Sequence, residues 1–175
     1  MAVRWHLFMD NIEEICCYYV SFLRSISLVH QNHHWLTKGK NFYGNHLMFE
    51  RIYNAAIEDV DAIAEKFVGV FNSDTLNLNK QSHFIQKILV KYANMEPLEG
   101  SLKIEEDFIE FSKHFYDVLE KENALTLGLE DIIPAISSNR ETAVYLLKGA
   151  SCEKDASISP VVSRINFLKK LQKLS

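Results

Sequence analysis

The sequence predicts an all-α fold, a bundle of four principal helices with a short helix in the link between the second and the third. Apolar residues recur at spacings of three and four over long segments, which indicates amphipathic helices. The 175 residues include only six Gly and three Pro, so few helix-breaking positions interrupt these segments. A hydrophobic content of 47% is sufficient for one buried core, and we expect a single domain over residues 1–175.

The first principal helix is predicted from about residue 6 to residue 37. Its apolar stripe alternates spacings of four and three, which is typical of a long amphipathic helix. The stripe consists of Phe8, Ile12, Ile15, Tyr19, Phe22, Ile26 and Val29. His30 and His33 lie on or beside this stripe and are interpreted as packed or surface side chains. Gly39 is expected to end the helix.

The second helix is predicted from Phe42 or Tyr43 to about Phe71. Its core face consists of Phe49, Tyr53, Ala56, Val60, Ile63, Ala64 and Phe67. Glu58 and Asp59 are expected on the solvated side of this helix. Residues 72–79 read as a polar connection, and residues 82–90 are expected to form the short helix.

The third helix is predicted from Leu102 to about Leu127, with Ser101 as a possible cap. Its inward residues are Ile104, Phe108, Phe111, Phe115, Val118 and Leu119. The acidic cluster Glu105, Glu106, Asp107 and Glu110 is interpreted as a charged helix start, the alternative being the wall of a pore.

The fourth helix is predicted to start after Pro134, with Ser138 as a possible cap and Ala143, Leu146 and Leu147 inward. Pro160 is expected to interrupt it. A last short helix, residues 161–174, contains four basic residues and no acidic one.

Charge and cysteine content limit the class of partner and the compartment. The formal net charge of −4 does not favour a nucleic-acid partner, because affinity for a polyanion grows with the Lys and Arg that displace its counterions. We therefore expect any DNA binding to be weak and to use the basic C-terminal segment. Cys16, Cys17 and Cys152 are too few for a disulfide framework, and no leader or membrane-spanning run is seen, so a cytoplasmic location is predicted.

A row of metal-binding residue types lies on one side of the second helix. At about 100° per residue, His46, Glu50, Asp61 and Glu65 fall within a sector of roughly 100°. A solvated helix normally spreads its charges around its exposed face, so this confinement indicates a row of ligands. His34, at the end of the first helix, can join the His46 end of the row.

The length of the row predicts that two copies of the chain share each site. His46 and Asp61 are separated by about 22 Å along a straight helix, whereas ligands lie about 2.0–2.2 Å from a metal ion. Antiparallel packing of two copies of the helix about a two-fold axis would bring the His46 end of one copy to the Asp61 end of the other, at two equivalent sites. Imidazole and carboxylate ligands suit Fe(II), and carboxylates also favour Fe(III), so redox iron chemistry is predicted.

Four helices with a long link between the second and third are typical of an up-down-down-up bundle of the ferritin-like kind. Many such bundles bind two iron ions in their interior through Glu-x-x-His pairs. No histidine among His30, His34, His46, His83 and His114 is preceded by Glu at the third residue back. This sequence therefore disfavours a metal site inside the bundle.

Residues of the metal row lie within a longer pattern that resembles a known family. The pattern consists of His34-Trp35, Gly39, Phe42, His46, Phe49-Glu50 and the segment Asp61-Ala62-Ile63-Ala64-Glu65-Lys66. It resembles the signature of the Dps miniferritins, the DNA-binding proteins from starved cells, and extends over about residues 20 to 68. The resemblance implies that His34, His46, Glu50, Asp61 and Glu65 form a mono-iron or di-iron ferroxidase centre across a dimer interface.

The resemblance also implies an assembly and an activity. It implies a hollow cage of twelve subunits, built from two-fold dimers, that oxidises Fe(II) with hydrogen peroxide or oxygen, stores ferric iron and protects against oxidative stress. The alternative is a DNA-protecting or structural assembly protein with the same fold, in which metal chemistry is secondary.

The sequence departs from the family pattern at several positions. Glu50 stands where Asp is usual, Lys66 stands where Arg is usual, and residues 151–175 resemble the continuous fourth helix of the family only faintly. The Lys-rich N-terminal tail that some members use for DNA contact is absent. Trp35, beside the expected centre, is read either as an electron relay or as a packed aromatic residue.

Overall fold

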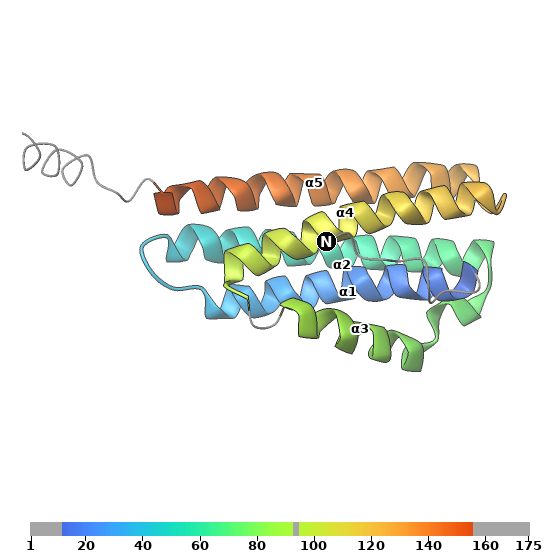
Figure 1. Cartoon of the computed structure of the whole chain (residues 1–175), viewed down its shortest axis with the longest axis horizontal. Coiled ribbons are helices and arrows are strands. Elements are labelled where there is room, and N and C mark those ends of the chain that lie inside the picture. Colours follow the sequence, from blue (N-terminus) through green and yellow to red (C-terminus); the bar gives the residue numbers. More distant parts are fainter. Residues whose placement is uncertain (1–11, 93–94, 156–175) are drawn as a thin grey trace, which may run out of the picture.

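The computed structural model describes residues 12–92 and 95–155, with side chains up to residue 151, and all of its elements are helical. In chain order they are α1 (Ile12–Leu36), α2 (Phe42–Val70), the short 3-10 helix η2 (Ser73–Leu76), α3 (Leu78–Tyr92), α4 (Pro97–Lys121) and α5 (Leu127–Asp155). Figure 1 shows α1, α2, α4 and α5 lying lengthwise beside one another, with α3 packed along α1. The predicted all-α bundle with a short helix between its second and third long helices is confirmed.

The long helices run in an up-down-down-up order. The colours of Figure 1 show α1 and α2 in opposite directions, α2 and α4 in the same direction, and α5 returning against α4. The connection through η2 and α3 makes the parallel step between α2 and α4 possible, because it carries the chain back along the bundle. This is the ferritin-like arrangement that the long link predicted.

The first two helices match the sequence prediction closely. The helix α1 ends at Leu36, and its predicted start near residue 6 lies outside the described residues, as do Phe8, Pro160 and the basic segment 161–174. Gly39 lies in the loop after α1 with a φ of 94°, a conformation that favours glycine. Both the end of the apolar pattern and the position of Gly39 predicted that α1 ends in this loop.

The third long helix both starts and ends earlier than predicted: it spans Pro97–Lys121, and not residues 102 to about 127. Pro97 occupies its first turn, where a proline costs no helical hydrogen bond, and the Glu96 side chain accepts hydrogen bonds from the backbone N–H groups of Leu98 and Glu99. Ser101 is therefore a buried residue inside α4, not its cap. Gly100 fits this crowded turn because a Cβ there would lie 3.1 Å from Met95 Cβ.

The prediction for the fourth helix was also wrong at its start. The helix α5 begins at Leu127, after Thr126, whose side chain and backbone oxygens accept hydrogen bonds from the N–H of Leu129. Pro134 lies within the helix on its exposed side. The carbonyl four residues earlier loses its helical donor there, and exposure lets water replace it. Ser138 is likewise inside α5.

Two apolar clusters form the core of the bundle. The larger is rich in aromatic rings that meet edge to face, as between Tyr19 and Phe108 and between Phe67 and Phe115. The smaller consists of Phe49, Ile52, Leu98, Ala143 and Leu147. A polar layer also lies inside the bundle and consists of the buried side chains His30, Asp59, Glu105 and Arg140. None of the described helices is long and apolar enough to cross a membrane.

Candidate metal centre

His34 and His46 face each other across the turn between α1 and α2. Their rings stack with centroids 3.6 Å apart and planes inclined at 22°. Each ring is within hydrogen-bond distance of the other residue's backbone carbonyl. His34 Nδ1 lies 2.9 Å from the His46 oxygen, and His46 Nδ1 lies 3.0 Å from the His34 oxygen. The carbonyl of His34 is in the last turn of α1, where no helical donor is available, so the His46 ring also caps this helix end.

These hydrogen bonds fix which ring nitrogen is free. A carbonyl oxygen can only accept, so Nδ1 of each ring must carry the hydrogen. In the neutral imidazoles the lone pair then resides on Nε2. Metal-bound histidines commonly donate their other N–H to a backbone carbonyl, which holds the ring in orientation. Both rings are therefore prepared to bind a metal ion through Nε2.

Aromatic side chains enclose the histidine pair. Phe42 stacks on His46 with ring centroids 5.1 Å apart, and Tyr53 meets His34 edge to face at 5.5 Å. Both histidines are half-buried as a result. Trp35, by contrast, is exposed, so the packing alternative for this residue is not realised within one chain.

The carboxylates predicted for the site occupy the same helix but not the same place. Glu50 lies one turn after His46 and is half-buried, whereas Asp61 and Glu65 are exposed three turns or more farther along α2. Among the described side chains, no three His, Cys, Asp or Glu residues lie where they could hold one metal ion. The single chain therefore brings His34 to His46 and leaves the Asp61 end of the row apart.

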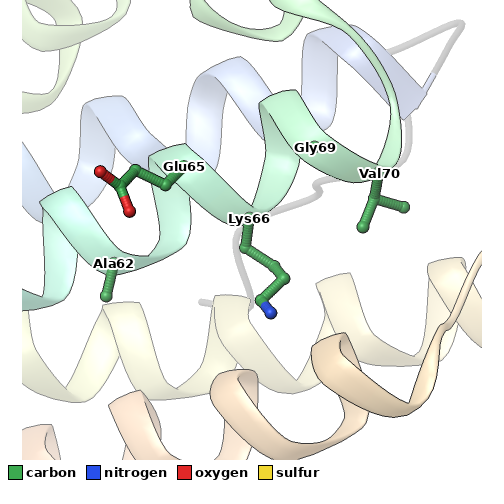
Figure 2. Close-up of a pocket in the computed structure, with 5 residues that line it drawn as sticks. All are labelled: Ala62, Glu65, Lys66, Gly69 and Val70. Atoms are coloured by element: carbon green, nitrogen blue, oxygen red, sulfur yellow. The ribbon is translucent and has the colours of Figure 1, made fainter.

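Glu65 also borders a surface pocket at the far end of α2. This pocket of about 580 Å³ is lined by Ala62, Glu65, Lys66, Gly69 and Val70. Figure 2 shows Lys66 extending from α2 toward the neighbouring helices, and its Nζ lies near Gly128 in the first turn of α5. Lys66 is therefore directed into the bundle side of the pocket, and we assign it no part in the metal row.

Apolar side chains surround the metal row on the outer face of α2. Tyr43, Leu47, Ile57 and Val68 are large and exposed. On a helical wheel of about 100° per residue they fall in the same sector as His46, Glu50, Asp61 and Glu65. Ala56 and Ile63, which are fully buried, fall on the opposite side. The metal row is therefore part of an exposed, partly apolar face.

Several charged residues that sequence analysis placed in solvent are buried inside the bundle. Asp59 is buried, as are Glu105 and Asp107 of the acidic cluster. This contradicts the predicted solvated side for Asp59 and the charged helix start for the cluster, since α4 begins eight residues before Glu105. Glu58 is exposed as predicted. Arg140, the partner of Asp59 and Glu105, lies on α5, far along the chain, so no local pattern could reveal these two pairings.

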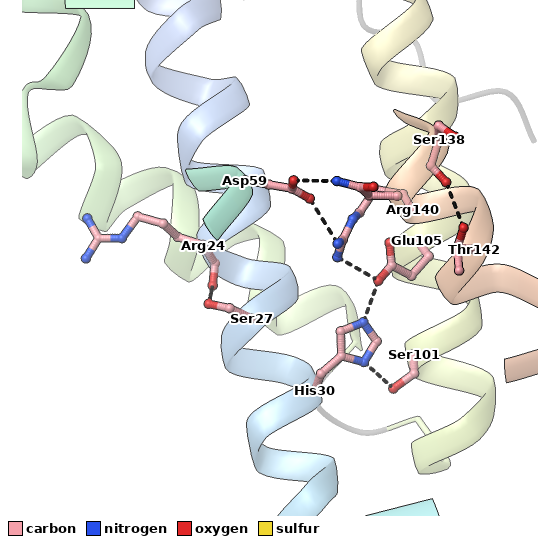
Figure 3. Close-up of polar contacts among 10 residues, drawn as sticks. Arg24, Ser27, His30, Asp59, Ser101, Glu105, Ser138, Arg140 and Thr142 are labelled. Atoms are coloured by element: carbon pink, nitrogen blue, oxygen red, sulfur yellow. Dashed lines mark hydrogen bonds and ion pairs between the residues drawn. The ribbon is translucent and has the colours of Figure 1, made fainter. Parts of the chain in front are cut away.

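Figure 3 shows how the buried charges connect. His30 Nε2 lies 2.7 Å from Glu105 Oε1, which is 3.4 Å from Arg140 Nη1. Arg140 Nη2 pairs with Asp59 Oδ2 at 2.9 Å, and Asn139 Nδ2 donates to Asp59 Oδ1 at 2.8 Å. Burial raises the pKa of Asp59, while the Arg140 charge opposes that rise. The packed interpretation of His30 is confirmed.

His33 is packed at the same end of the bundle. Its Nδ1 lies 2.6 Å from Ser101 Oγ, and the ring is buried against Phe49. Burial lowers the pKa of His33 to about 4, with the neighbouring His30 acting in the same direction. His33 is therefore neutral near pH 7 and belongs to the core, although it adjoins His34 in the sequence.

Comparison with known proteins supports the fold and one sequence relationship. No family model matches the chain. General stress protein 20U of Bacillus subtilis (strain 168) is 28% identical over 120 residues, which is 67% of this chain and 81% of the relative.

Two solved structures are similar over most of their length. Dps from Thermosynechococcus elongatus superposes with a TM-score of 0.68 at 15% identity and covers 85% of this chain and 94% of its own. Dps from Listeria monocytogenes gives a TM-score of 0.67 at 16% identity and covers 81% of this chain and 94% of its own. The resemblance to the Dps proteins is thus confirmed, and the chain has their ferritin-like fold.

Proposed function

We propose that this chain belongs to the Dps family and is a ferroxidase that stores the ferric product. The observation that supports this best is the stacked His34–His46 pair, in which both Nδ1–H groups are held by backbone carbonyls and both Nε2 atoms are left for a metal ion. Similarity to a general stress protein supports a role in protection under stress.

The site would be completed by a second copy of the chain. Asp61 and Glu65 are on the same helix as His46 but about 22 Å or more away from it, too far to ligate the same ion. Antiparallel packing of two α2 helices about a two-fold axis supplies Asp61 and Glu65 of one subunit to His34, His46 and Glu50 of the other. We propose that such dimers build a dodecameric cage.

The chemistry follows from the ligand set. Fe(II) is the substrate, bound by imidazole nitrogen and carboxylate oxygen, and carboxylates favour the harder Fe(III). Two Fe(II) supply the two electrons that break the O–O bond of one hydrogen peroxide. The peroxide oxygens end as water or hydroxide, and hydrolysis of Fe(III) to the stored mineral releases protons. Oxygen is the alternative oxidant.

We place this activity in the cytoplasm, because the free, buried thiols of Cys16 and Cys17 are typical of a reducing compartment.

Single substitutions test the residue assignment. We expect His34→Ala and Asp61→Ala each to abolish the fast rise in ferric absorbance after peroxide is added to the Fe(II)-loaded protein, because each removes a ligand. Asp117→Ala, at an exposed position of α4, is the matched control and should keep the wild-type rate. An unchanged rate in both His34→Ala and Asp61→Ala would show that the assignment is wrong.

Mixed dimers test whether the site is shared. One variant lacks His34 and His46, and a second lacks Asp61 and Glu65; each alone contains only broken sites. In a verified heterodimer of the two, one interface unites the intact histidines with the intact carboxylates, so one working centre per dimer should return. If every ligand of a site came from one chain, mixing would restore nothing.

A further inference from the structure

The polar layer inside the bundle contains one charged or imidazole side chain from each long helix. His30 comes from α1, Asp59 from α2, Glu105 from α4 and Arg140 from α5, and all four are buried. Figure 3 shows them converging between the helices, linked from His30 through Glu105 and Arg140 to Asp59. An imidazole and two carboxylates on three separate helices are the donor types that ferritin-like bundles use to hold iron in their interior.

A guanidinium group lies between the two carboxylates of this set. Arg140 reaches Glu105 through Nη1 and Asp59 through Nη2, so it bridges the two carboxylates as a shared cation would. Arginine cannot lose its proton in a protein, so this charge is permanent. Among the described residues, Glu105 Oε2 and Arg140 Nε are buried and have no hydrogen-bond partner. The carboxylate thus keeps an unused acceptor atom inside the bundle.

We propose that Arg140 is a built-in counterion which closes a latent metal site formed by His30, Asp59 and Glu105. With Arg140 present, the interior does not fit a metal ion: the guanidinium lies between the two carboxylates, His30 contacts Glu105 alone of the two, and no three donors among the described residues are placed to hold one ion. Without it, two buried carboxylates would face each other with no cation between them, which is strongly unfavourable. A divalent ion would satisfy both, together with His30.

This inference concerns residues outside the row on α2 and does not rest on the proposed function. It predicts that the identity of one side chain decides whether the bundle interior accepts metal.

The test uses Co(II) as the probe in a background that lacks the exposed site, His34→Ala with Asp61→Ala. We expect Arg140→Gln in this background to bind one additional equivalent of Co(II) per chain, with visible absorption bands, and to unfold at a higher temperature when Co(II) is added. Arg140→Lys, which keeps a cation, is the matched control and should show neither effect. Adding Glu105→Gln to Arg140→Gln should remove the extra equivalent.

Three binding results would overturn the proposal. The first is an Arg140→Gln chain that binds no additional Co(II), and the second is an additional equivalent that survives Glu105→Gln. The third is that Glu105→Gln, made in the background that retains Arg140, removes one bound equivalent of Co(II). If Arg140→Gln fails to fold without metal, refolding with and without Co(II) decides the matter: folding only with Co(II) supports the latent site, and failure in both conditions overturns it.

Discussion

Ser101 has one hydroxyl hydrogen and two imidazole neighbours. Its Oγ lies 3.1 Å from His30 Nδ1 and 2.6 Å from His33 Nδ1. Glu105 accepts a hydrogen bond from His30 Nε2, so when the His30 ring is neutral its Nδ1 carries no hydrogen and accepts from the Ser101 hydroxyl. The Ser101 oxygen then accepts from Nδ1–H of His33. A single serine thus couples the protonation of His33, at the end of α1, to the His30–Glu105 pair in the bundle interior.

Acid sensitivity should follow from His33. Because its pKa is about 4 in the folded protein and about 6.5 when unfolded, the unfolded state takes up a proton first as pH falls. Stability that is present above pH 6.5 is therefore lost between about 6.5 and 4, by at most about 3 kcal/mol. We expect His33→Gln to lose less stability than wild type over this range, measured by urea unfolding at successive pH values.

The control for this experiment is His83→Gln. His83 is an exposed residue on α3, so its replacement should leave the pH dependence of wild type unchanged. Titrating groups that contact neither His33 nor Ser101 contribute equally to all three proteins, so the difference between the slopes reports on His33 and on the His30–Glu105 pair coupled to it. Equal slopes for wild type and His33→Gln would contradict the assignment of the lowered pKa to this ring.

Single residues were predictable where the chain brings them together locally. The His34–His46 pair spans one short turn between two helices, so their spacing was enough to place them at one end of the predicted site. Asp59 and Glu105 were misjudged because each lies among polar neighbours in sequence, and burial became favourable only through Arg140 on a distant helix. Charge pairing across a bundle leaves no periodic signal in any one helix.

At the scale of elements, helix interiors were predicted better than helix ends. The apolar residues of α1 and α2 recur with the period of an α-helix over most of each segment, and few other structures fit that period. Both helices were therefore placed correctly within the described residues. Two of the errors at helix starts arose at prolines. Pro97 was read as a break although it starts α4, and Pro134 was read as a start although it lies inside α5. Proline fits either role, and the choice depends on capping by Glu96 and on solvent exposure.

The helix α3 is fastened to α4 around Asp107. Tyr92 donates its hydroxyl hydrogen to Asp107 Oδ2 at 2.7 Å, and Lys91 and Lys103 form ion pairs with the same carboxylate. Burial alone would raise the pKa of Asp107, but the hydrogen bonds from Lys103, Lys91 and Tyr92 outweigh it and hold the pKa below its usual value. The ionised carboxylate is therefore the form that holds α3 in place.

The buried hydrogen bond should matter more than either exposed ion pair. The side chains of Lys91 and Lys103 are 42% and 48% exposed, so solvent screens each pair to below about 1 kcal/mol. Tyr92 is buried and bonds a charged acceptor, and we expect Tyr92→Phe to cost about 1–2 kcal/mol in urea unfolding. Amide hydrogen exchange in α3 should quicken in parallel. A larger loss from Lys103→Ala than from Tyr92→Phe would contradict this ranking.

The order of the long helices followed from the length of one link. A short turn can only join antiparallel neighbours, whereas residues 71–96 are long enough to return the chain along the bundle and set α2 parallel to α4. The packing of α3 against α1 was not predicted: only residues 82–90 were expected to be helical, whereas α3 spans Leu78–Tyr92 and buries Gln81, Ile88 and Tyr92. Topology was thus easier to predict than the path of the link.

The outer face of α2 gives the whole molecule its most testable feature. Exposed apolar residues are ordinary when scattered, but Tyr43, Leu47, Ile57 and Val68 share one sector of one helix with the metal row. Such a face is suited to self-association, and an antiparallel pairing would place the two-fold axis near the middle of the row, close to Asn54 and Ile57.

Replacing Ile57 by Lys should therefore break the dimer. Ile57 is 49% exposed in the single chain, so the lysine would be tolerated by the fold itself. In the dimer the two new ammonium groups would lie near each other and lose their water without gaining an anionic partner, which is strongly unfavourable. We expect native mass spectrometry and sedimentation velocity to show mainly monomers for Ile57→Lys.

The matched control is Tyr145→Lys, because Tyr145 is a large aromatic residue of α5 that is 76% exposed. This variant should leave the two-fold dimer intact. Full assembly of Ile57→Lys would exclude the antiparallel α2 pairing and, with it, the shared iron site.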